Sequence, residues 1–227
     1  MAAVDELLAE LRAHLRAAVS YTTASMPNDV YEGFLFSLVI ATARKSGAQI
    51  RYQDVNGSMA SNLVFRTSPG WLYSTARNYT HAVLEFGRAP ELEVHIGVKV
   101  QGNSGVEHEC DVVVLDAEEA DLCRFARTSP RASKCLLVIE CKYYTGHLPL
   151  GQARGFAGLS ADLGRRAHPI FVANTGSGSV TKYLTGRTLS RELHVVPRAS
   201  EVEGVQSLIR EAFKDHVGRR DSGLRVY

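Results

Sequence analysis

Residues 135–144 read CLLVIECKYY, a short apolar run that carries one glutamate and one lysine. Four apolar residues precede Glu140 directly, and a run of this length predicts a strand in the core of a sheet. Side chains alternate across a strand, so Glu140 and Lys142 point to the same face, about 6.6 Å apart along the chain. Because an unpaired buried charge is costly, this strand needs partners for its charges.

Asp111 poses the same problem on a second predicted strand, over residues 109–115, where three valines follow it. If the two strands are neighbours, Asp111 can join Glu140 and Lys142 at one edge of the sheet. A divalent cation such as Mg²⁺ would complete the group. Hard cations take oxygen ligands from one or two carboxylates, keep several waters and bind substrate phosphate with the rest.

The rest of the chain predicts helices and strands around these two charged strands. Apolar spacing predicts helices over residues 4–19, 30–46, 118–127, 150–163, 180–184 and 202–216. Further strands are expected over residues 82–86, 92–100, 169–173 and 193–196, and residues 57–80 predict loops and irregular strands. Because strands and helices alternate in the second half, we expect an α/β fold with a mixed central β-sheet flanked by helices.

Length and composition predict a single globular domain. The chain has 227 residues, of which 45% are hydrophobic and 22% charged, and these values exclude a disordered, coiled-coil or collagen-like protein. We expect residues 1–27 to form a helix and loop appendage and residues 28–227 to form the main domain.

An Asp on one strand and Glu-x-Lys on the next, after an acid-bearing helix and before a second helix, resembles the PD-(D/E)XK nuclease superfamily. This is the restriction-endonuclease-like fold, and the likeness covers about residues 28–200 in element order. It implies that Asp111 and Glu140 bind Mg²⁺, with Mn²⁺ as a substitute, and that the carbonyl of Cys141 joins them. Lys142 would orient or activate the attacking water. Cys110 stands where the family motif has its proline.

Two further matches to the superfamily are softer. Glu32 fits the place of a helix glutamate that completes the acidic site in some members, although it is also placed to pair with the helix dipole. Gln152 begins Gln-x-x-x-Phe, which is similar to the Gln-x-x-x-Tyr of the RecB-like branch, but Phe156 lacks the hydroxyl. Glu109 is a spare acid beside Asp111, with either a second-metal role or none.

The Glu-x-Lys triplet alone is also typical of an exposed edge strand with a surface ion pair. Its apolar context argues against that alternative. The role of Lys142 stays open, since a lysine in a partly dry site can either position water as a cation or act as a base with a lowered pKa.

Charge is distributed unevenly along the chain. Residues 1–150 carry 14 Lys and Arg against 17 Asp and Glu, whereas residues 151–227 carry 12 against 7. The basic part would suit contacts with a phosphate backbone, although ordinary surface scatter gives the same counts. Trp71, Tyr73 and Tyr79 are candidates for stacking on bases, or for packing in the core.

The cysteines predict a reducing compartment. The four are not in C-x-x-C spacing, so we expect free buried thiols. The longest uncharged apolar run, residues 33–43, falls far short of the ~20 residues of a membrane helix. The N-terminus lacks the pattern of a signal peptide. We therefore expect a cytoplasmic protein with no membrane partner.

Together these features predict a Mg²⁺-dependent nuclease that hydrolyses DNA phosphodiester bonds, as an endonuclease in defence, restriction or repair. RNA is not excluded as the substrate. Cutting two strands needs two sites, so we expect a homodimer or larger homo-oligomer. The alternative is the same fold used as a non-catalytic subunit that binds nucleic acid or scaffolds a partner.

Overall fold

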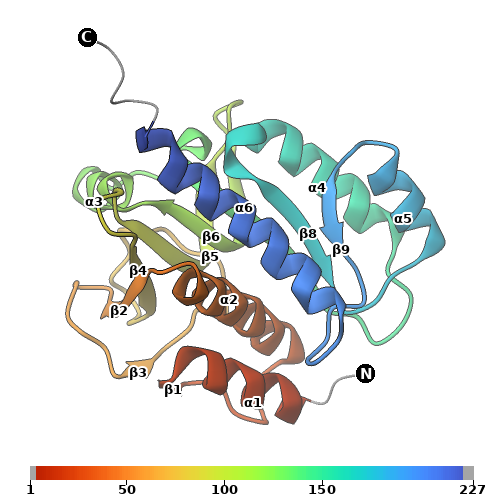
Figure 1. The fold of residues 1–227 in the computed structure, drawn as a ribbon, viewed down its shortest axis with the longest axis horizontal. Coiled ribbons are helices and arrows are strands. Elements are labelled where there is room, and N and C mark those ends of the chain that lie inside the picture. The colour runs from red at the N-terminus through yellow and green to blue at the C-terminus, as the bar shows by residue number, and fades with distance from the viewer. Residues whose placement is uncertain (1–3, 222–227) are drawn as a thin grey trace.

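A seven-stranded sheet runs through the middle of the protein, and helices cover both of its faces (Figure 1). The computed structural model describes residues 4–221, with side chains for residues 4–218. The strand order is β2-β4-β5-β6-β7-β8-β9, antiparallel from β2 to β7 and parallel from β7 to β9. The strands are β2 (Gln49–Asp54), β4 (Thr80–Glu85), β5 (Leu92–Gln101), β6 (Glu107–Asp116), β7 (Cys135–Lys142), β8 (Pro169–Ala173) and β9 (Ser190–Glu192). The predicted mixed α/β sheet flanked by helices is confirmed.

Two layers of helices pack against the sheet. They are α1 (Val4–Leu15), α2 (Pro27–Lys45), α3 (Ala117–Ala126), α4 (Leu150–Leu163), α5 (Gly178–Thr185) and α6 (Glu201–Asp221). In Figure 1, α2 and α6 lie side by side across the front of the sheet, and α1 lies outside α2. Alternation along β8 divides the core accordingly. Ile170 and Val172 pack in the cluster of α2 and α6, whereas Phe171 and Ala173 pack with α4 and α5.

The all-round apolar character of α2 follows from its position between the sheet and α1. Its residues from Phe34 to Ile40 are buried, and so are the four leucines that α1 turns toward it: Leu7, Leu8, Leu11 and Leu15. These leucines belong to the same core cluster as α2 and the sheet. Arg16 ends α1 with a left-handed φ of +57°, so the helix is shorter than the predicted 4–19. Ala18–Val19 (β1) then pairs with Asn62–Leu63 (β3) in a separate two-stranded sheet.

Strands β5 and β6 change the face to which their side chains point near their middle. Ile96 and its partner Val112 lie in the cluster of α2, whereas Val98 and its partner Cys110 lie in the cluster that contains Cys123 of α3. Gly97 stands between them with φ +62°, a conformation that a residue with a Cβ rarely adopts. This irregularity in β5 sets the face of the sheet to which the neighbouring side chains of β5 and β6 point.

Some elements differ from their prediction. Helix α4 and strand β8 match the predicted residues, but β2 was not predicted. The strand predicted over residues 193–196 is wrong, because the strand here is β9, and His194 then takes φ +62°. Val195 is buried. Its N–H donates to the carbonyl of Ala173 and its carbonyl accepts the hydroxyl of Tyr31, so its backbone is hydrogen-bonded without belonging to a strand.

The four cysteines are free and buried, as their spacing predicts. None of the helices within residues 4–221 is both long enough and apolar enough to cross a membrane.

Candidate active site

The five predicted catalytic residues line one cavity of about 500 Å³. Glu32 comes from α2, Asp111 from β6, Glu140 and Lys142 from β7, and Gln152 from α4. The other residues that line it are Asn28, Tyr31, Glu109, Cys141, Tyr143 and Tyr144. The cavity therefore collects four carboxyl groups and one amine from segments that are up to 110 residues apart in the sequence.

Asp111 lies where the β6–β7 ladder ends. The last pair in this direction is Val112 with Ile139. Beyond it, the carboxylate of Asp111 takes the backbone N–H of Cys141, with Oδ2 2.6 Å from the nitrogen. The side chain replaces the carbonyl partner that a continuing strand would supply. This bond fixes the buried carboxylate of Asp111 at the point where β6 and β7 stop pairing.

Lys142 stands between the two carboxylates of the predicted motif. Its Nζ is 2.7 Å from Oε1 of Glu140 and 3.5 Å from Oδ2 of Asp111. Burial alone would lower the pKa of Lys142, but the negative charges of Asp111 and Glu140 raise it above its usual value. Lys142 is thus held as a cation, which favours the positioning role over that of a base.

The carboxyl groups in the cavity outnumber their positive partners. Burial, and then the charge of Asp111, raises the pKa of Glu32 to about 9 and that of Glu140 to about 6. Burial also raises the pKa of Asp111, against the opposing effects of Lys142 and the Cys141 N–H. The pKa of Glu109 is raised by burial and by Asp111. The group has a surplus of acids that one ammonium does not neutralise.

This donor set fits a hard divalent cation. Within the described side chains, residues 4–218, no three His, Cys, Asp or Glu groups form a ready-made metal cluster. Mg²⁺ does not require one, because it is usually held by one or two carboxylates and keeps several waters. Asp111 and Glu140 are oxygen donors of that kind, and the surplus of acids is what a cation would relieve. Cys141 contributes its N–H to Asp111, and the part of its carbonyl as a ligand stays a prediction.

Gln152 contacts a hydroxyl that sequence reasoning missed. Its Nε2 donates to Oη of Tyr144 at 2.8 Å. Asn174 fixes Tyr144 from the other side, because its Oδ1 accepts the Tyr144 N–H and its Nδ2 donates to the Tyr144 carbonyl. Phe156, the position without a hydroxyl, is buried against Phe171 of the core. A tyrosine pair directly after Glu-x-Lys was the signal in the sequence for this hydroxyl.

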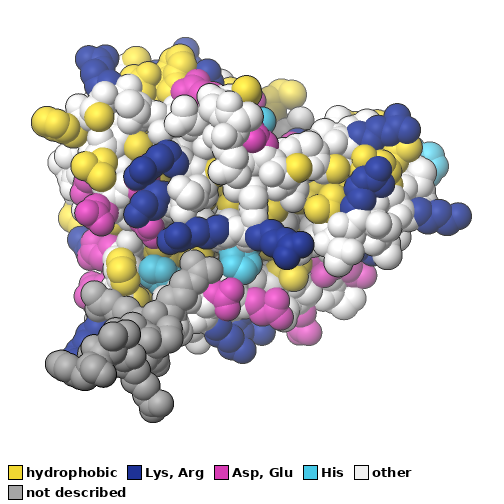
Figure 2. Space-filling view, turned by 90° about the horizontal axis from the view of Figure 1, so that it is seen from above, with side chains coloured by type: hydrophobic (Ala, Val, Ile, Leu, Met, Phe, Trp, Pro, Cys, Tyr) yellow, Lys and Arg dark blue, Asp and Glu magenta, His cyan; other side chains and the backbone are white. Residues whose placement is uncertain are grey.

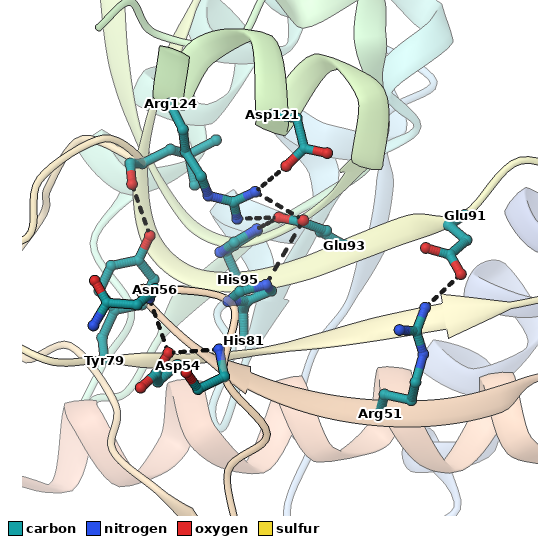
Figure 3. Close-up of polar contacts among 12 residues, drawn as sticks. Arg51, Asp54, Asn56, Tyr79, His81, Glu91, Glu93, His95, Asp121 and Arg124 are labelled. Carbon is teal, nitrogen blue, oxygen red and sulfur yellow. Dashed lines mark hydrogen bonds and ion pairs between the residues drawn. The ribbon is translucent and has the colours of Figure 1, made fainter.

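A second buried charged cluster lies between β4, β5 and α3, around Glu93 (Figure 3). Glu93 accepts hydrogen bonds from His95 and Arg124, and the rings of His81 and His95 stack with centroids 4.8 Å apart. Although burial acts to raise it, the bonds from His95 and Arg124 lower the pKa of Glu93 to about 2. Because Arg124 contacts both oxygens of Glu93, this cluster is already neutralised by the chain's own groups.

The predicted nucleic-acid contacts divide between the surface and the core. Tyr79 is buried, donates to the Leu72 carbonyl and packs in the core, whereas Trp71 is 37% exposed. Tyr73 stacks on Trp71. In the view of Figure 2, Lys and Arg side chains are mixed with acids and apolar groups rather than gathered in one basic patch.

Comparisons with known proteins add little to this geometry. No protein-family model and no curated protein matches the chain. Among solved structures, a match is the crystal structure of a protein of unknown function, AF1548. It has 17% sequence identity and a TM-score of 0.30, and the alignment covers 56% of this chain and 90% of that one. A likeness at that level carries no argument about fold or function.

Proposed function

We propose that this protein is a Mg²⁺-dependent nuclease that hydrolyses phosphodiester bonds of DNA. One observation carries the proposal: Asp111, Glu140 and Lys142 converge from two neighbouring strands in one cavity that contains more acids than cations. The resemblance of these residues to the PD-(D/E)XK motif supports it. The cavity volume of about 500 Å³ leaves room for a phosphate group beside these side chains.

Each group has a part in this chemistry. Asp111 and Glu140 would hold Mg²⁺, which, when bound, supplies charge stabilisation at the phosphate and favours ionisation of water. Lys142, held as a cation, places positive charge against the phosphoryl oxygens as negative charge develops on them. The bond from Asp111 to the Cys141 N–H holds the acidic group in place before substrate arrives. Such preorganised charges are effective because they need no rearrangement during the reaction.

Cleavage assays on plasmid, linear duplex, single-stranded DNA and RNA test the proposal. We expect wild type to cut DNA with Mg²⁺ or Mn²⁺, and Asp111→Asn and Lys142→Met to lose about 10²-fold or more of the rate. Lys134→Met is the matched control. Lys134 lies outside the cavity, and its Nζ is 3.7 Å from Oδ2 of Asp116. Folded Asp111→Asn and Lys142→Met variants that cut as fast as wild type would contradict the assignment.

A thermal-shift titration separates this proposal from a non-catalytic nucleic-acid-binding or scaffolding subunit. We expect Mg²⁺ to raise the melting temperature, since a ligand that binds only the folded state stabilises it. Glu32→Gln should change the metal-free melting temperature little, because the raised pKa keeps Glu32 protonated at pH 7. It should reduce the Mg²⁺ response if Glu32 completes the acidic site. No response to Mg²⁺ or Mn²⁺ in wild type, with DNA binding but no cleavage, would favour the subunit.

Assembly and location follow from the same proposal. A cut through both strands needs two sites, so a homodimer or larger assembly stays a prediction, which light scattering at micromolar concentration checks. The four free thiols support a reducing compartment and hence the cytoplasm.

A further inference from the structure

An aromatic stack lies on the surface beside β5. The rings of Trp71 and Tyr73 are nearly parallel, with centroids 5.9 Å apart and an angle of 17° between them. A cation lies over each ring. Lys99 Nζ lies 4.1 Å from the centroid of Trp71, and the guanidinium of Arg127 lies 5.7 Å from that of Tyr73. We call these four residues the aromatic stack.

The backbone holds the aromatic stack in place. Gly70 extends the sheet beside β5, because its N–H bonds to the Gly97 carbonyl and its own carbonyl accepts the N–H of Lys99. Leu72 is buried, which anchors the segment between the exposed ring of Trp71 and the half-buried ring of Tyr73. Arg127 is the C-cap of α3 with a left-handed backbone conformation, so the end of the helix fixes the position of its Cα. Backbone hydrogen bonds, a buried side chain and a helix end therefore position the residues of the stack.

Glu107 completes the support of Trp71. Its carboxylate accepts the indole N–H, with both oxygens 3.2 Å from Nε1, and lies 3.8 Å from Lys99 Nζ. It also accepts a hydrogen bond from Ser129. Three donors therefore share this one carboxylate, which reduces the repulsion that it would exert on an approaching phosphate.

The aromatic stack adjoins the candidate active site. Lys99 lies directly opposite Glu109 across β5 and β6, and Glu109 lines the cavity. Glu107, Glu109 and Asp111 follow at two-residue intervals, so about 13 Å of strand separates the support of Trp71 from the proposed metal ligand. One nucleic-acid strand can reach both places.

We propose that the aromatic stack binds an unpaired base of a single-stranded nucleic acid whose backbone passes through the cavity. An incoming base displaces one of the two cations from its ring, because base stacking on an aromatic ring outweighs an exposed cation–π contact. The displaced Lys99 or Arg127 is then free to meet the adjacent phosphate. A paired base keeps its faces inside the duplex and gains nothing here. This inference rests on the proposed function only for the place of the cavity.

Trp71 is the single tryptophan of the chain, so its fluorescence reports on this surface alone. The protein is titrated in EDTA with an oligothymidylate, with an abasic oligonucleotide of the same length and with a blunt duplex. We expect saturable quenching by the oligothymidylate and little by the other two. Quenching by the oligothymidylate that does not exceed that of the abasic strand overturns the inference. A parallel titration with oligouridylate shows whether the stack accepts DNA alone or RNA as well, and saturable quenching by either supports it.

Variants give a second readout, the anisotropy of a labelled single strand. Trp71→Leu and Tyr73→Leu should each weaken binding about ten-fold, and Trp71→Phe should restore most of it. Tyr183→Leu is the matched control, because the guanidinium of Arg187, just after α5, lies 3.7 Å from the ring centroid of Tyr183 in the same kind of contact. Equal affinities for Tyr73→Leu, Tyr183→Leu and wild type would overturn the inference.

The Asp111→Asn variant separates this inference from the nuclease proposal. It should keep the quenching while it loses cleavage. Quenching of wild type without cleavage of any nucleic acid supports the stack and contradicts the nuclease. Cleavage of DNA without quenching by single strands overturns the stack and leaves the nuclease standing.

Discussion

Two groups of buried carboxylates on the same sheet differ in how their charge is balanced. Glu93 has Arg124 and His95 on its oxygens, and its pKa falls to about 2. Glu140 shares Lys142 with Asp111, and its pKa rises to about 6 because burial and the neighbouring acid dominate. A balanced group fits a structural role, whereas an acid surplus fits a site that receives a cation.

The histidines beside Glu93 make the stability of the fold sensitive to acid. Burial, with the charge of His95, lowers the pKa of His81 from 6.5 to about 3, and burial lowers that of His95. Between these pH values the unfolded chain binds protons that the folded chain does not. The free energy of unfolding therefore falls as the pH falls, by about 1.4 kcal/mol per pH unit for each proton.

We predict that His81→Phe, which keeps a ring against His95 but cannot titrate, reduces this acid slope by about one proton. Neither ring nitrogen of His81 has a hydrogen-bond partner among the described residues, so the change leaves no donor stranded. Urea unfolding at pH 7, 6, 5 and 4 measures the slope. Because its pKa is lowered, Glu93 also reduces the free energy of unfolding as the pH falls, but only below about pH 4.5 and in both proteins. Identical slopes for variant and wild type would show that His81 is not responsible.

At the level of elements, Gly97 decides where the acids of β6 point. The side chains of β5 before and after Gly97, and those of β6 before and after Asp111, pack in different core clusters. An alanine there would strain the backbone, because φ +62° costs a residue with a Cβ about 1–2 kcal/mol. The atoms near a new Cβ, Cβ of Arg66 and the carbonyl of Ser68, are both 3.6 Å away, so the strain comes from the backbone rather than from a clash.

We predict that Gly97→Ala lowers cleavage by about 10²-fold beyond its effect on stability, since a small displacement of a catalytic group is costly. Gly105→Ala is the control. It lies at the tip of the same hairpin with φ +86° and open space around a new Cβ, so it carries similar backbone strain away from the cavity. Rates per folded molecule and melting temperatures are compared. Equal rates in the two variants would argue that Gly97 does not position Asp111.

For the whole molecule, α1 covers the outer side of α2. Leu11 is fully buried between them, and α1 shares one core cluster with the sheet. We predict that Leu11→Ala lowers the free energy of unfolding by about 2–5 kcal/mol in a single cooperative transition. Chemical unfolding followed by far-UV circular dichroism and tryptophan fluorescence measures it.

Leu122→Ala is the matched control, because Leu122 is 54% exposed on α3 and its loss should cost less than about 0.5 kcal/mol. If Leu11→Ala instead produced a separate early transition, residues 1–27 would behave as the appendage that the sequence predicts. Coincident transitions by both probes would place the helix within the same folding unit.

The elements whose bounds agree with prediction are those in which the local spacing of apolar residues is regular. Helix α4 and strand β8 occupy the predicted ranges because one is regularly amphipathic and the other is a short apolar run between turn residues. Strand β2 is an edge strand with half-buried residues, so its alternation is weak. The strand at residues 193–196 was wrong because the apolar Val195 pairs its backbone with Ala173 and Tyr31 instead of a ladder.

The sequence by itself determined an α/β fold and singled out Asp111, Glu140 and Lys142, since charges inside apolar strands are conspicuous in any fold. Only the tertiary structure decided that these residues meet Glu32 and Gln152 in one cavity, that Asp111 and Glu140 raise the pKa of Lys142 there, and that Tyr144 supplies a hydroxyl. The reason is physical. Strand patterns arise from local alternation, whereas distances, burial and the resulting pKa values depend on which distant segments the sheet order brings together.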